Sequence, residues 1–185
     1  RIRYYRMETN QGVHAARAYG VQQTKAEFIA LLDDDDYWLP EKIEKQMALM
    51  AACPQTSIVC CGALDVYPNG KKMLRMPIAK TITYRQELVY EWTIASSILF
   101  RRSAYEDAGG FDGGLKRCGD WDCWIRMAQK QPIRALSEPL VVTQMRNGSL
   151  QRSKEVELFA ANRFKILEKH QDELLSEGLW HEALS

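Results

Sequence analysis

The chain has 185 residues, of which 46% are apolar and 26% are charged, and its formal net charge is +1. This length suits one domain with a sizeable buried core, and so balanced a charge gives no electrostatic reason to expect a nucleic-acid partner. No apolar run approaches the roughly 20 residues that cross a bilayer, and the opening residues lack the apolar stretch of a signal peptide. We therefore expect a protein that acts in the cytoplasm, with the inner face of the membrane as an alternative place.

The five cysteines and three histidines give no sign of a disulfide framework or a zinc site. No C-x-x-C pair occurs, and Cys60 and Cys61 lie inside an apolar, strand-like run. The histidines also lack the spacing to cysteines that zinc ligands show. Reduced, mostly buried thiols are therefore expected.

The first elements of the chain alternate between helix and strand. Asn10 can cap a helix that runs to about residue 23 and is rich in small side chains. Residues 27–32 are expected to form a strand buried on both faces, because residues 28–32 are a continuous apolar run. Pro40 suits the first turn of a second helix, in which apolar residues recur at helical spacing.

The rest of the chain continues the alternation and predicts an α/β sheet with one antiparallel excursion. Residues 77–95 give no clear pattern, and residues 109–114 are rich in glycine, as loops are. The expected elements are a strand at 57–61, a hairpin at 65–76 with Asn-Gly in its turn, a strand at 97–100, helices at 104–108 and from Gly119, strands at 133–136 and 140–145, and an amphipathic helix from 153 to about 175.

Four consecutive carboxylates, Asp33–Asp36, connect the apolar strand to the second helix. Adjacent carboxylates repel one another, so the block must be solvated, protonated or neutralised by a cation. Because strand residues alternate in direction, Asp33 and Asp35 can share one side. Their oxygens suit Mg²⁺ or Mn²⁺, which in turn suits a phosphate-bearing substrate. A solvated acidic loop is the alternative.

Asp120 follows a glycine-rich stretch at the predicted start of a helix. The helix dipole favours an ionised carboxylate there, and such a group can act as a general base towards a hydroxyl. The alternative is an ordinary N-cap without catalysis. Asp122 is expected to be a first-turn charge or a partner that supports the site.

Tryptophans and one arginine are further candidates. Trp38 and Trp92 could offer surfaces for sugar stacking, whereas the helical spacing of Trp121 and Trp124 favours a place in the core. Arg146 could contact a phosphate, and an exposed loop arginine explains it equally well.

Five segments occur in one order and are specific as a set. They read N-Q-G-V-H-A-A-R-A-Y-G at 10–20, F-I-A-L-L-D-D-D-D-Y-W-L-P-E-K at 28–42, S-S-I-L-F-R-R at 96–102, G-G-F-D at 109–112 and G-D-W-D-C-W-I-R-M-A at 119–128. Over roughly residues 1–152 the chain resembles the family 2 glycosyltransferases. The resemblance implies the GT-A fold, a Rossmann-like α/β/α sandwich with a mixed, mostly parallel sheet. Residues 153–185 then form an amphipathic helical extension, expected to pack on the domain or, alternatively, to lie on a membrane.

The same resemblance implies an inverting transfer of a sugar from a nucleotide-sugar, with a UDP-sugar as the expected donor. The acceptor would be a hydroxyl of a saccharide or a lipid-linked molecule, in the synthesis of a polysaccharide or another glycan. Mn²⁺ or Mg²⁺ is the expected cofactor, because it offsets negative charge on the leaving diphosphate.

Individual roles follow from the matching motifs. Asp33 and Asp35 take the place of the D-x-D carboxylates, with Asp35 as the direct metal ligand, and Asp34 would reach the ribose or the sugar of the donor. Asp120 takes the place of the catalytic base. Arg17 stands where the family has an arginine on the donor side.

Three departures from the family pattern bear on activity. The strand–helix–strand unit that reads the nucleotide base should precede Arg1 and is absent, so we expect this chain alone to be inactive or nearly so. Gly119 stands where the family often has a glutamate, and Arg146 lies in a loop where many relatives have a histidine.

Two other functions remain open at this stage. A non-catalytic module that binds a nucleotide-sugar or a glycan could use the same fold. Nucleotidyl transfer to a sugar phosphate also uses acidic metal sites, but it predicts a glycine-rich, basic phosphate loop near the start, which this sequence lacks.

Overall fold

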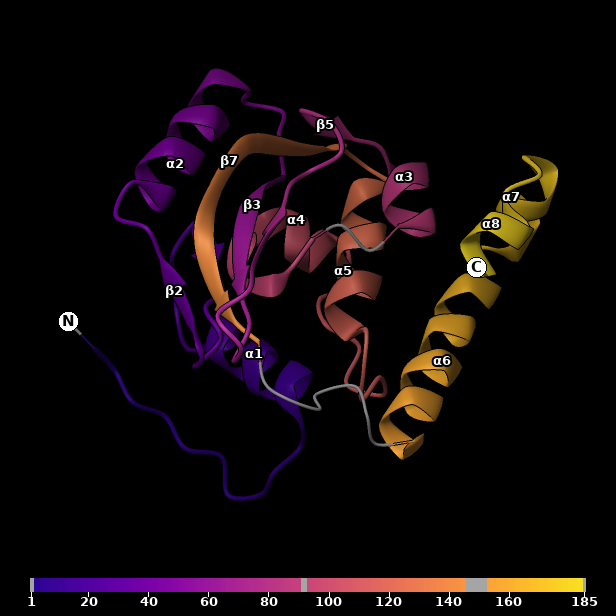
Figure 1. Ribbon diagram of the computed structural model, residues 1–185, viewed down its shortest axis with the longest axis horizontal. Helices are drawn as coiled ribbons and strands as arrows, with labels where there is room; N and C mark the ends of the chain where they lie inside the picture. The colour runs from indigo at the N-terminus through magenta and orange to yellow at the C-terminus, as the bar shows by residue number, and fades with distance from the viewer. Residues whose placement is uncertain (1, 91–92, 146–152, 185) are drawn as a thin grey trace.

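The computed structural model describes residues 2–90, 93–145 and 153–184, and a curled mixed sheet lies at its centre (Figure 1). The main strand order is β1-β6-β3-β7-β2, with β4 paired to β3 and β5 paired to β7. The strands are β1 (Phe28–Ala30), β2 (Asp36–Trp38), β3 (Ile58–Val66), β4 (Lys72–Arg75), β5 (Thr81–Ile82), β6 (Leu99–Arg101) and β7 (Ile133–Gln144). The helices are α1 (Val13–Gln22), α2 (Lys42–Ala52), α3 (Tyr84–Val89), the 3₁₀ turn η1 (Ala95–Ser97), α4 (Arg102–Asp107), α5 (Gly119–Ala128), α6 (Ser153–Glu168), α7 (Gln171–Ser176) and α8 (Trp180–Leu184).

Strand directions differ from the expectation of a mostly parallel sheet, which is wrong for the described part of the chain. Among the described pairings β3 and β7 run parallel, while β1–β6, β2–β7, β3–β4, β3–β6 and β5–β7 are antiparallel. An alternation of strands and helices along the sequence does not show whether two paired strands run parallel or antiparallel. The short strands β1 and β2 both pair antiparallel with their neighbours. The hairpin between β3 and β4 is confirmed, with Gly70 at φ 81° in its turn.

The long parallel pair β3–β7 is the spine of the sheet. The two short strands expected at 133–136 and 140–145 form one strand, β7, and Pro139 lies at an irregularity opposite Gly62. Proline lacks the N–H that a regular ladder needs, so a shift in register is where a strand can carry it. The gap that the sequence predicts between strands at 133–136 and 140–145 is thus a bulge within β7.

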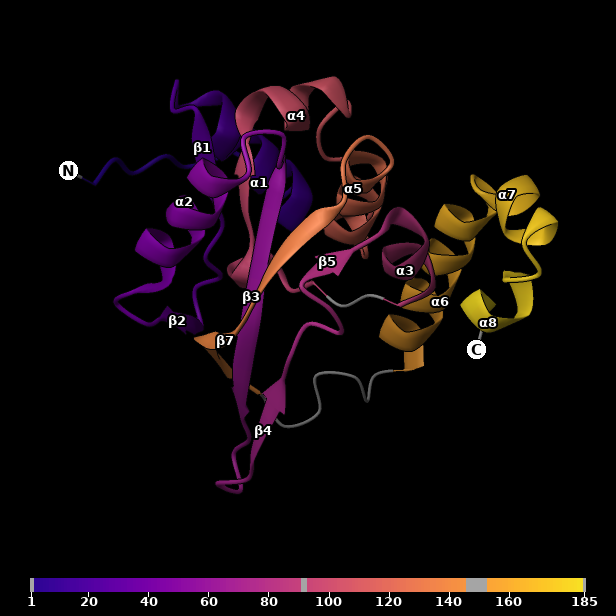
Figure 2. The same ribbon diagram turned by 90° about the horizontal axis from the view of Figure 1, so that it is seen from above.

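Helices cover both faces of the sheet, as Figure 2 shows for α2 on one side and α4 and α5 on the other. Neighbouring residues of β3 point to opposite faces. Ile58 joins the larger core, which includes Phe100 and Trp124, whereas Val59 packs with Met50 of α2. Both faces of β3 are therefore buried, which explains its continuous apolar run.

Helix α5 lies at the centre of the core. Trp121 and Trp124 are fully buried, as their spacing predicted. The indole N–H of Trp121 donates to the Glu87 carbonyl at 2.7 Å, and the Trp124 ring contacts Phe100 and Phe111. Because these contacts fix the rest of α5, the position of its first turn is also well determined.

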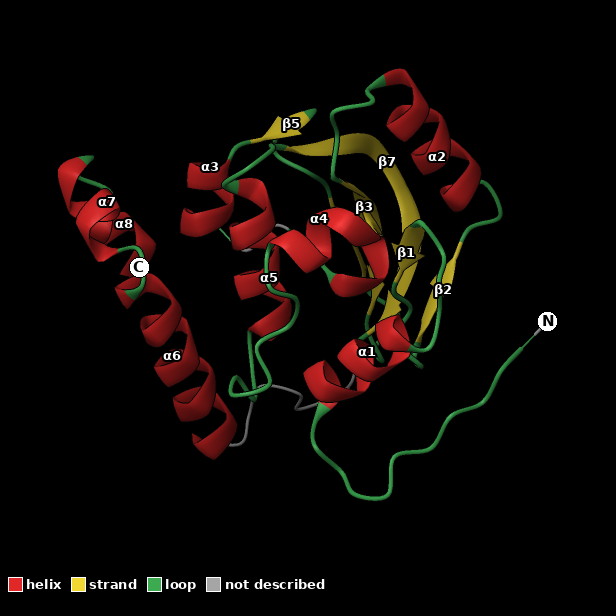
Figure 3. Cartoon of the chain, turned by 180° about the vertical axis from the view of Figure 1, so that it is seen from behind, coloured by secondary structure: helices red, strands yellow, loops and turns green. Residues whose placement is uncertain are grey.

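The C-terminal helices pack beside α3 and α5, away from the sheet (Figure 3). The single helix expected to about residue 175 ends at Glu168, and α7 and α8 follow as separate helices. The apolar spacing in the sequence continues past Glu168 because Leu174 of α7 and Leu167 of α6 pack in the same buried cluster. The spacing therefore does not reveal where α6 ends. Lys169, at the break, reaches back to the carboxylate of Asp122 at 2.9 Å. In the part of the chain that is described, no helix is both long and apolar enough to cross a membrane.

Gly62 provides a test of the tight packing beside the bulge. A Cβ atom at this position would lie 3.1 Å from the carbonyl oxygens of both Arg75 and Glu138. We expect Gly62→Ala to lower the free energy of unfolding by about 1–3 kcal/mol, because backbone atoms must move. The matched control is Gly20→Ala in α1, where nothing lies within 4 Å of the added methyl group. That change should raise stability by about 0.5–1 kcal/mol. Equal effects of the two changes in chemical denaturation would contradict the assigned packing.

Candidate functional site

An open pocket of about 590 Å³ lies where the end of β1, the start of α1 and the start of α5 meet. We call it the central pocket. Its lining residues come from distant parts of the sequence and include most of the charged side chains singled out above. They are Val13, His14, Arg17, Asp33, Asp34, Asp35, Lys116, Arg117, Cys118, Asp120, Met145 and Phe159. Arg146 and Trp92 lie outside the described residues, so the structure does not place them.

The acidic block is a tight turn and not the end of a strand. Strand β1 stops at Ala30, and the Asp36 N–H donates to the Asp33 carbonyl at 3.2 Å. The argument from strand alternation is therefore wrong for this segment. The turn nevertheless brings Asp33, Asp34 and Asp35 to the same pocket.

Ser96 holds this turn from the other side. Its hydroxyl oxygen, which is buried, accepts the Asp33 N–H at 3.0 Å. Burial raises the pKa of Asp36, a hydrogen bond from Ser96 lowers it, and the nearby carboxylates of Asp33 and Asp35 raise it. Negative charge is thus crowded at the turn, and a cation there would relieve the repulsion.

The donor set at the turn suits a hard divalent cation. Carboxylate oxygens are the preferred ligands of Mg²⁺ and Mn²⁺, and Mg²⁺ commonly takes only one or two carboxylates and completes its shell with substrate phosphates and water. Among the described residues, no group of three or more His, Cys, Asp or Glu side chains stands together as a metal site. A cation held by Asp33 and Asp35 would therefore need the rest of its ligands from a phosphate-bearing substrate and water.

Arg17 joins the acidic turn to Asp120. Its guanidinium donates to Asp33 Oδ1 at 2.6 Å and to Asp120 Oδ2 at 3.2 Å, and its side chain is only 12% exposed. The expectation for Arg17 concerns the donor side of the site and includes neither of these contacts. One partly buried cation thus neutralises and aligns two carboxylates that face the pocket.

Asp120 lies in the first turn of α5 and does not cap it, because Cys118 occupies the N-cap position. The N-cap alternative for Asp120 is therefore wrong. Its carboxylate faces the central pocket with 21% of the side chain exposed, which leaves it accessible to a substrate hydroxyl. Asp122, two residues on, is buried and pairs with Arg126 and Lys169, so its role is structural support.

The sequence reading missed several residues of the pocket. His14 lies three residues before Arg17 and shares its face of α1, a spacing that could have flagged it. Lys116 and Arg117 bring positive charge to the rim, but they sit in a loop with no periodic pattern. Ser96 gave no signal beyond its position before a strand.

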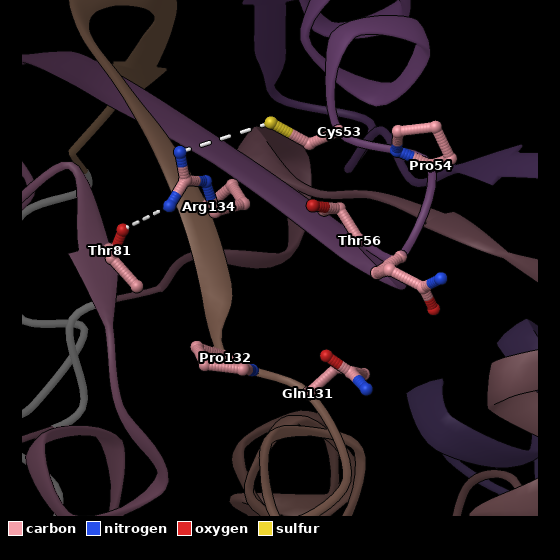
Figure 4. A pocket seen from close by; sticks show the side chains of 8 residues that line it. Cys53, Pro54, Thr56, Thr81, Gln131, Pro132 and Arg134 are labelled. Atoms are coloured by element: carbon pink, nitrogen blue, oxygen red, sulfur yellow. Dashed lines mark hydrogen bonds between the residues drawn. The ribbon is translucent and has the colours of Figure 1, made fainter.

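A second pocket, of about 330 Å³, lies beside the ends of α2 and β5 and has a different character (Figure 4). Arg134 points across it, with hydrogen bonds to Thr81 Oγ1 at 2.5 Å and to Cys53 Sγ at 3.9 Å. Its described lining includes no carboxylate and none of the predicted site residues. It offers no base or cation site comparable to the central pocket.

Comparison with known proteins agrees with the motifs that line the central pocket. The sequence model described as Glycosyl transferase family 2 matches residues 1–109. The chain belongs to this family. It is 31% identical over 134 residues to the uncharacterized glycosyltransferase YwdF of Bacillus subtilis, covering 69% of the chain and 48% of YwdF. It is 26% identical over 145 residues to the amylovoran biosynthesis glycosyltransferase AmsE of Erwinia amylovora, covering 77% of the chain and 53% of AmsE.

Nearly the whole of this chain superposes on part of a solved structure. Residues 1–349 of S. aureus TarS, crystallised with UDP-GlcNAc, superpose with a TM-score of 0.67 and 23% identity over 97% of this chain and 56% of that one. The expected GT-A fold is thereby confirmed. The chain spans about half the length of YwdF and AmsE.

Ser96 allows a test of how the acidic turn is held. Ser96→Ala removes the acceptor of the Asp33 N–H and a hydrogen bond to Asp36. We expect a loss of about 1 kcal/mol in unfolding free energy, together with weaker donor binding, because the partly buried Asp33 N–H loses its partner. The matched control is Ser97→Ala, whose equally buried hydroxyl donates to the Ile94 carbonyl and does not touch the turn. Donor binding that falls equally in both variants would show that Ser96 has no special role.

Proposed function

We propose that the protein is an inverting glycosyltransferase that moves a sugar from a nucleotide diphosphate sugar to an acceptor hydroxyl. The observation that carries this proposal is the meeting of Asp120 with the acidic turn in one pocket, with Arg17 between them. A base and a diphosphate-binding region must lie side by side in such an enzyme, because attack and departure take place on opposite faces of one carbon. Family membership supports the same reaction class.

Asp120 is the proposed general base. As the acceptor oxygen attacks the anomeric carbon, Asp120 takes the hydroxyl proton. The new bond between carbon and acceptor oxygen forms while the bond to the diphosphate oxygen breaks, and the diphosphate leaves with the electron pair. Attack from the opposite face inverts the configuration of the anomeric carbon. Arg17 keeps the Asp120 carboxylate directed into the pocket.

On this proposal the donor diphosphate lies over the acidic turn. Asp35 and Asp33 would hold Mn²⁺ or Mg²⁺, and Asp34 would contact the ribose or the sugar. The bound cation would supply positive charge that stabilises the leaving diphosphate. Lys116 and Arg117 add positive charge on the rim of the pocket, where phosphate oxygens can be met.

The donor and the biological role are proposed from the relatives. TarS has been crystallised with UDP and with UDP-GlcNAc, which supports a UDP-sugar as donor here. AmsE is named for amylovoran biosynthesis, which supports a saccharide or lipid-linked acceptor in polysaccharide or glycan synthesis. Residues 1–152 would form the transferase domain and residues 153–185 a helical extension, with action in the cytoplasm or at the inner face of the membrane.

Replacement of the proposed base tests the chemistry. Asp120→Asn, in the full-length protein, should lower kcat by about 10²–10⁴-fold with little change in donor affinity, because the amide cannot take a proton. The measurement is release of nucleotide diphosphate in the presence of an acceptor, beside donor titration by calorimetry. Wild-type protein that binds donor but never transfers it would favour the non-catalytic module instead.

Asp122→Asn is the matched control, since it lies in the same helical turn. It weakens the pairs with Arg126 and Lys169 and should lower stability by about 1–3 kcal/mol. The folded enzyme should retain its kcat to within about twofold. A large loss of kcat in this control would mean that any disturbance of α5 stops turnover. The loss in Asp120→Asn would then be no evidence that Asp120 is the base.

Removal of the metal tests the role of the acidic turn. Treatment with a chelator should abolish turnover, and added Mn²⁺ should restore it. Asp35→Asn should raise the Mn²⁺ concentration needed for half-maximal activity by about tenfold or more, which is at least about 1.4 kcal/mol. Asp36→Asn, a change in the same block outside the pocket lining, should have a much smaller effect. Full activity in chelator would overturn the metal assignment.

A further inference from the structure

His14 makes an unusual contact with the main chain just before Asp120. Its imidazole Nε2 accepts the backbone N–H of Gly119 at 3.1 Å, and the residue is 5% exposed. A Cβ atom at position 119 would lie 2.7 Å from His14 Cδ2 and 2.8 Å from Cγ. The His14 ring therefore fills the space that any side chain at position 119 would need.

The start of α5 depends on such support. The first N–H groups of a helix have no partner within the helix and need acceptors from elsewhere. Cys118, at the N-cap, has φ 59°, a left-handed conformation that costs free energy for a residue with a Cβ atom. Cysteine is also not among the side chains favoured at this position. The ring of His14, on α1, supplies the acceptor for the Gly119 N–H, while Asp120 Oδ1 accepts the Trp121 N–H at 3.1 Å.

Helix α1 therefore holds Asp120 at two points. His14 binds the main chain next to it, and Arg17, one helical turn later, binds its carboxylate. The His14 ring is itself packed near Phe111, with ring centroids 6.2 Å apart. A main-chain anchor and a side-chain anchor together restrict both the place and the direction of the carboxylate.

We propose that His14 is a positioning residue for Asp120, matched to glycine at position 119. The inference rests on the proposed function, because it assigns His14 to the placement of the catalytic base. Loss of His14 should lower kcat, because a displacement of about 1 Å at a reacting group such as Asp120 can cost around 10²-fold in rate. Donor affinity depends on the acidic turn, which His14 does not hold.

The charge state of His14 agrees with its role as an acceptor. Burial lowers its pKa from the ordinary value of 6.5, Asp120 and Asp33 raise it, and Arg17 and Arg117 lower it. With Nε2 accepting a hydrogen bond, the ring proton of the neutral form lies on Nδ1. Protonation of Nε2 in acid would break the bond to Gly119. Because the folded pKa is lowered, this contribution to stability is present above 6.5 and is lost as the pH falls below that value and through the folded pKa.

The experiment compares His14→Ala, His14→Gln and the control His170→Ala in the complete protein. We expect His14→Ala to lower kcat by about tenfold or more with donor KM changed less than about twofold. Glutamine carries an amide oxygen that can replace Nε2, so His14→Gln should recover most of the loss. His170 is a half-buried histidine, bonded to the Tyr84 hydroxyl and outside the pocket lining, so its replacement should affect stability alone.

The pH profile separates positioning from simple stabilisation. In the wild type, kcat should fall in acid as His14 protonates, and His14→Gln, whose amide cannot take that proton, should move this limb to lower pH. An unchanged acid limb in His14→Gln, or equal losses of kcat in His14→Ala and His170→Ala, would overturn the proposal.

A double-mutant cycle in unfolding experiments tests the match between His14 and Gly119 without any assay of activity. Gly119→Ala alone should destabilise the fold, because the methyl group meets the ring. In His14→Ala/Gly119→Ala the methyl group has room, so its cost should largely disappear. Additive losses would overturn the match. If the wild type transfers no sugar, the proposed function fails together with the catalytic role of His14, while this cycle still decides the packing.

Discussion

The guanidinium of Arg17 is the contact on which the arrangement of the site depends. It lies between Asp33 and Asp120, which the chain keeps far apart in sequence and the fold brings to one pocket. Two carboxylates facing one partly buried space repel each other unless a cation lies between them. Arg17 offsets that repulsion and directs both groups. The acidic turn and the start of α5 can therefore coexist before any ligand binds.

This contact is effective because rigid elements carry its members. Helix α5 is fixed by two fully buried tryptophans, so the place of its first turn is set by the core. The acidic turn is held to the same frame by the Ser96 hydroxyl. Helix α1 meets both, with His14 and Arg17 on one face. The site thus depends on packing that extends well beyond the pocket.

The acidic turn connects the two strands that stand at opposite ends of the main strand order, β1 and β2. Short strands β1 and β2 flank the acidic turn and pair with β6 and β7. In a regular strand the side chains of Asp33, Asp34 and Asp35 would point to alternate sides, whereas the turn directs all three to the central pocket. A strand that continued through Asp35 would have directed one of these carboxylates away from the pocket. The break after Ala30 is therefore what allows Asp33, Asp34 and Asp35 to line one pocket.

The sequence alone determined the family, the existence of most elements, and the burial of Trp121 and Trp124, because these follow from periodicity and from ordered motifs. It also singled out the two acidic groups that the fold brings to the central pocket. It did not determine strand direction, the merger of two apolar runs into β7, or the end of α6 at Glu168, because those depend on partners distant in sequence. Only the tertiary structure decided that Arg17 bridges Asp33 and Asp120 and that the His14 ring fills the space beside Gly119. The spacing of apolar residues predicts which face of a helix is buried. It does not predict which atoms contact that face, because those atoms come from distant parts of the chain.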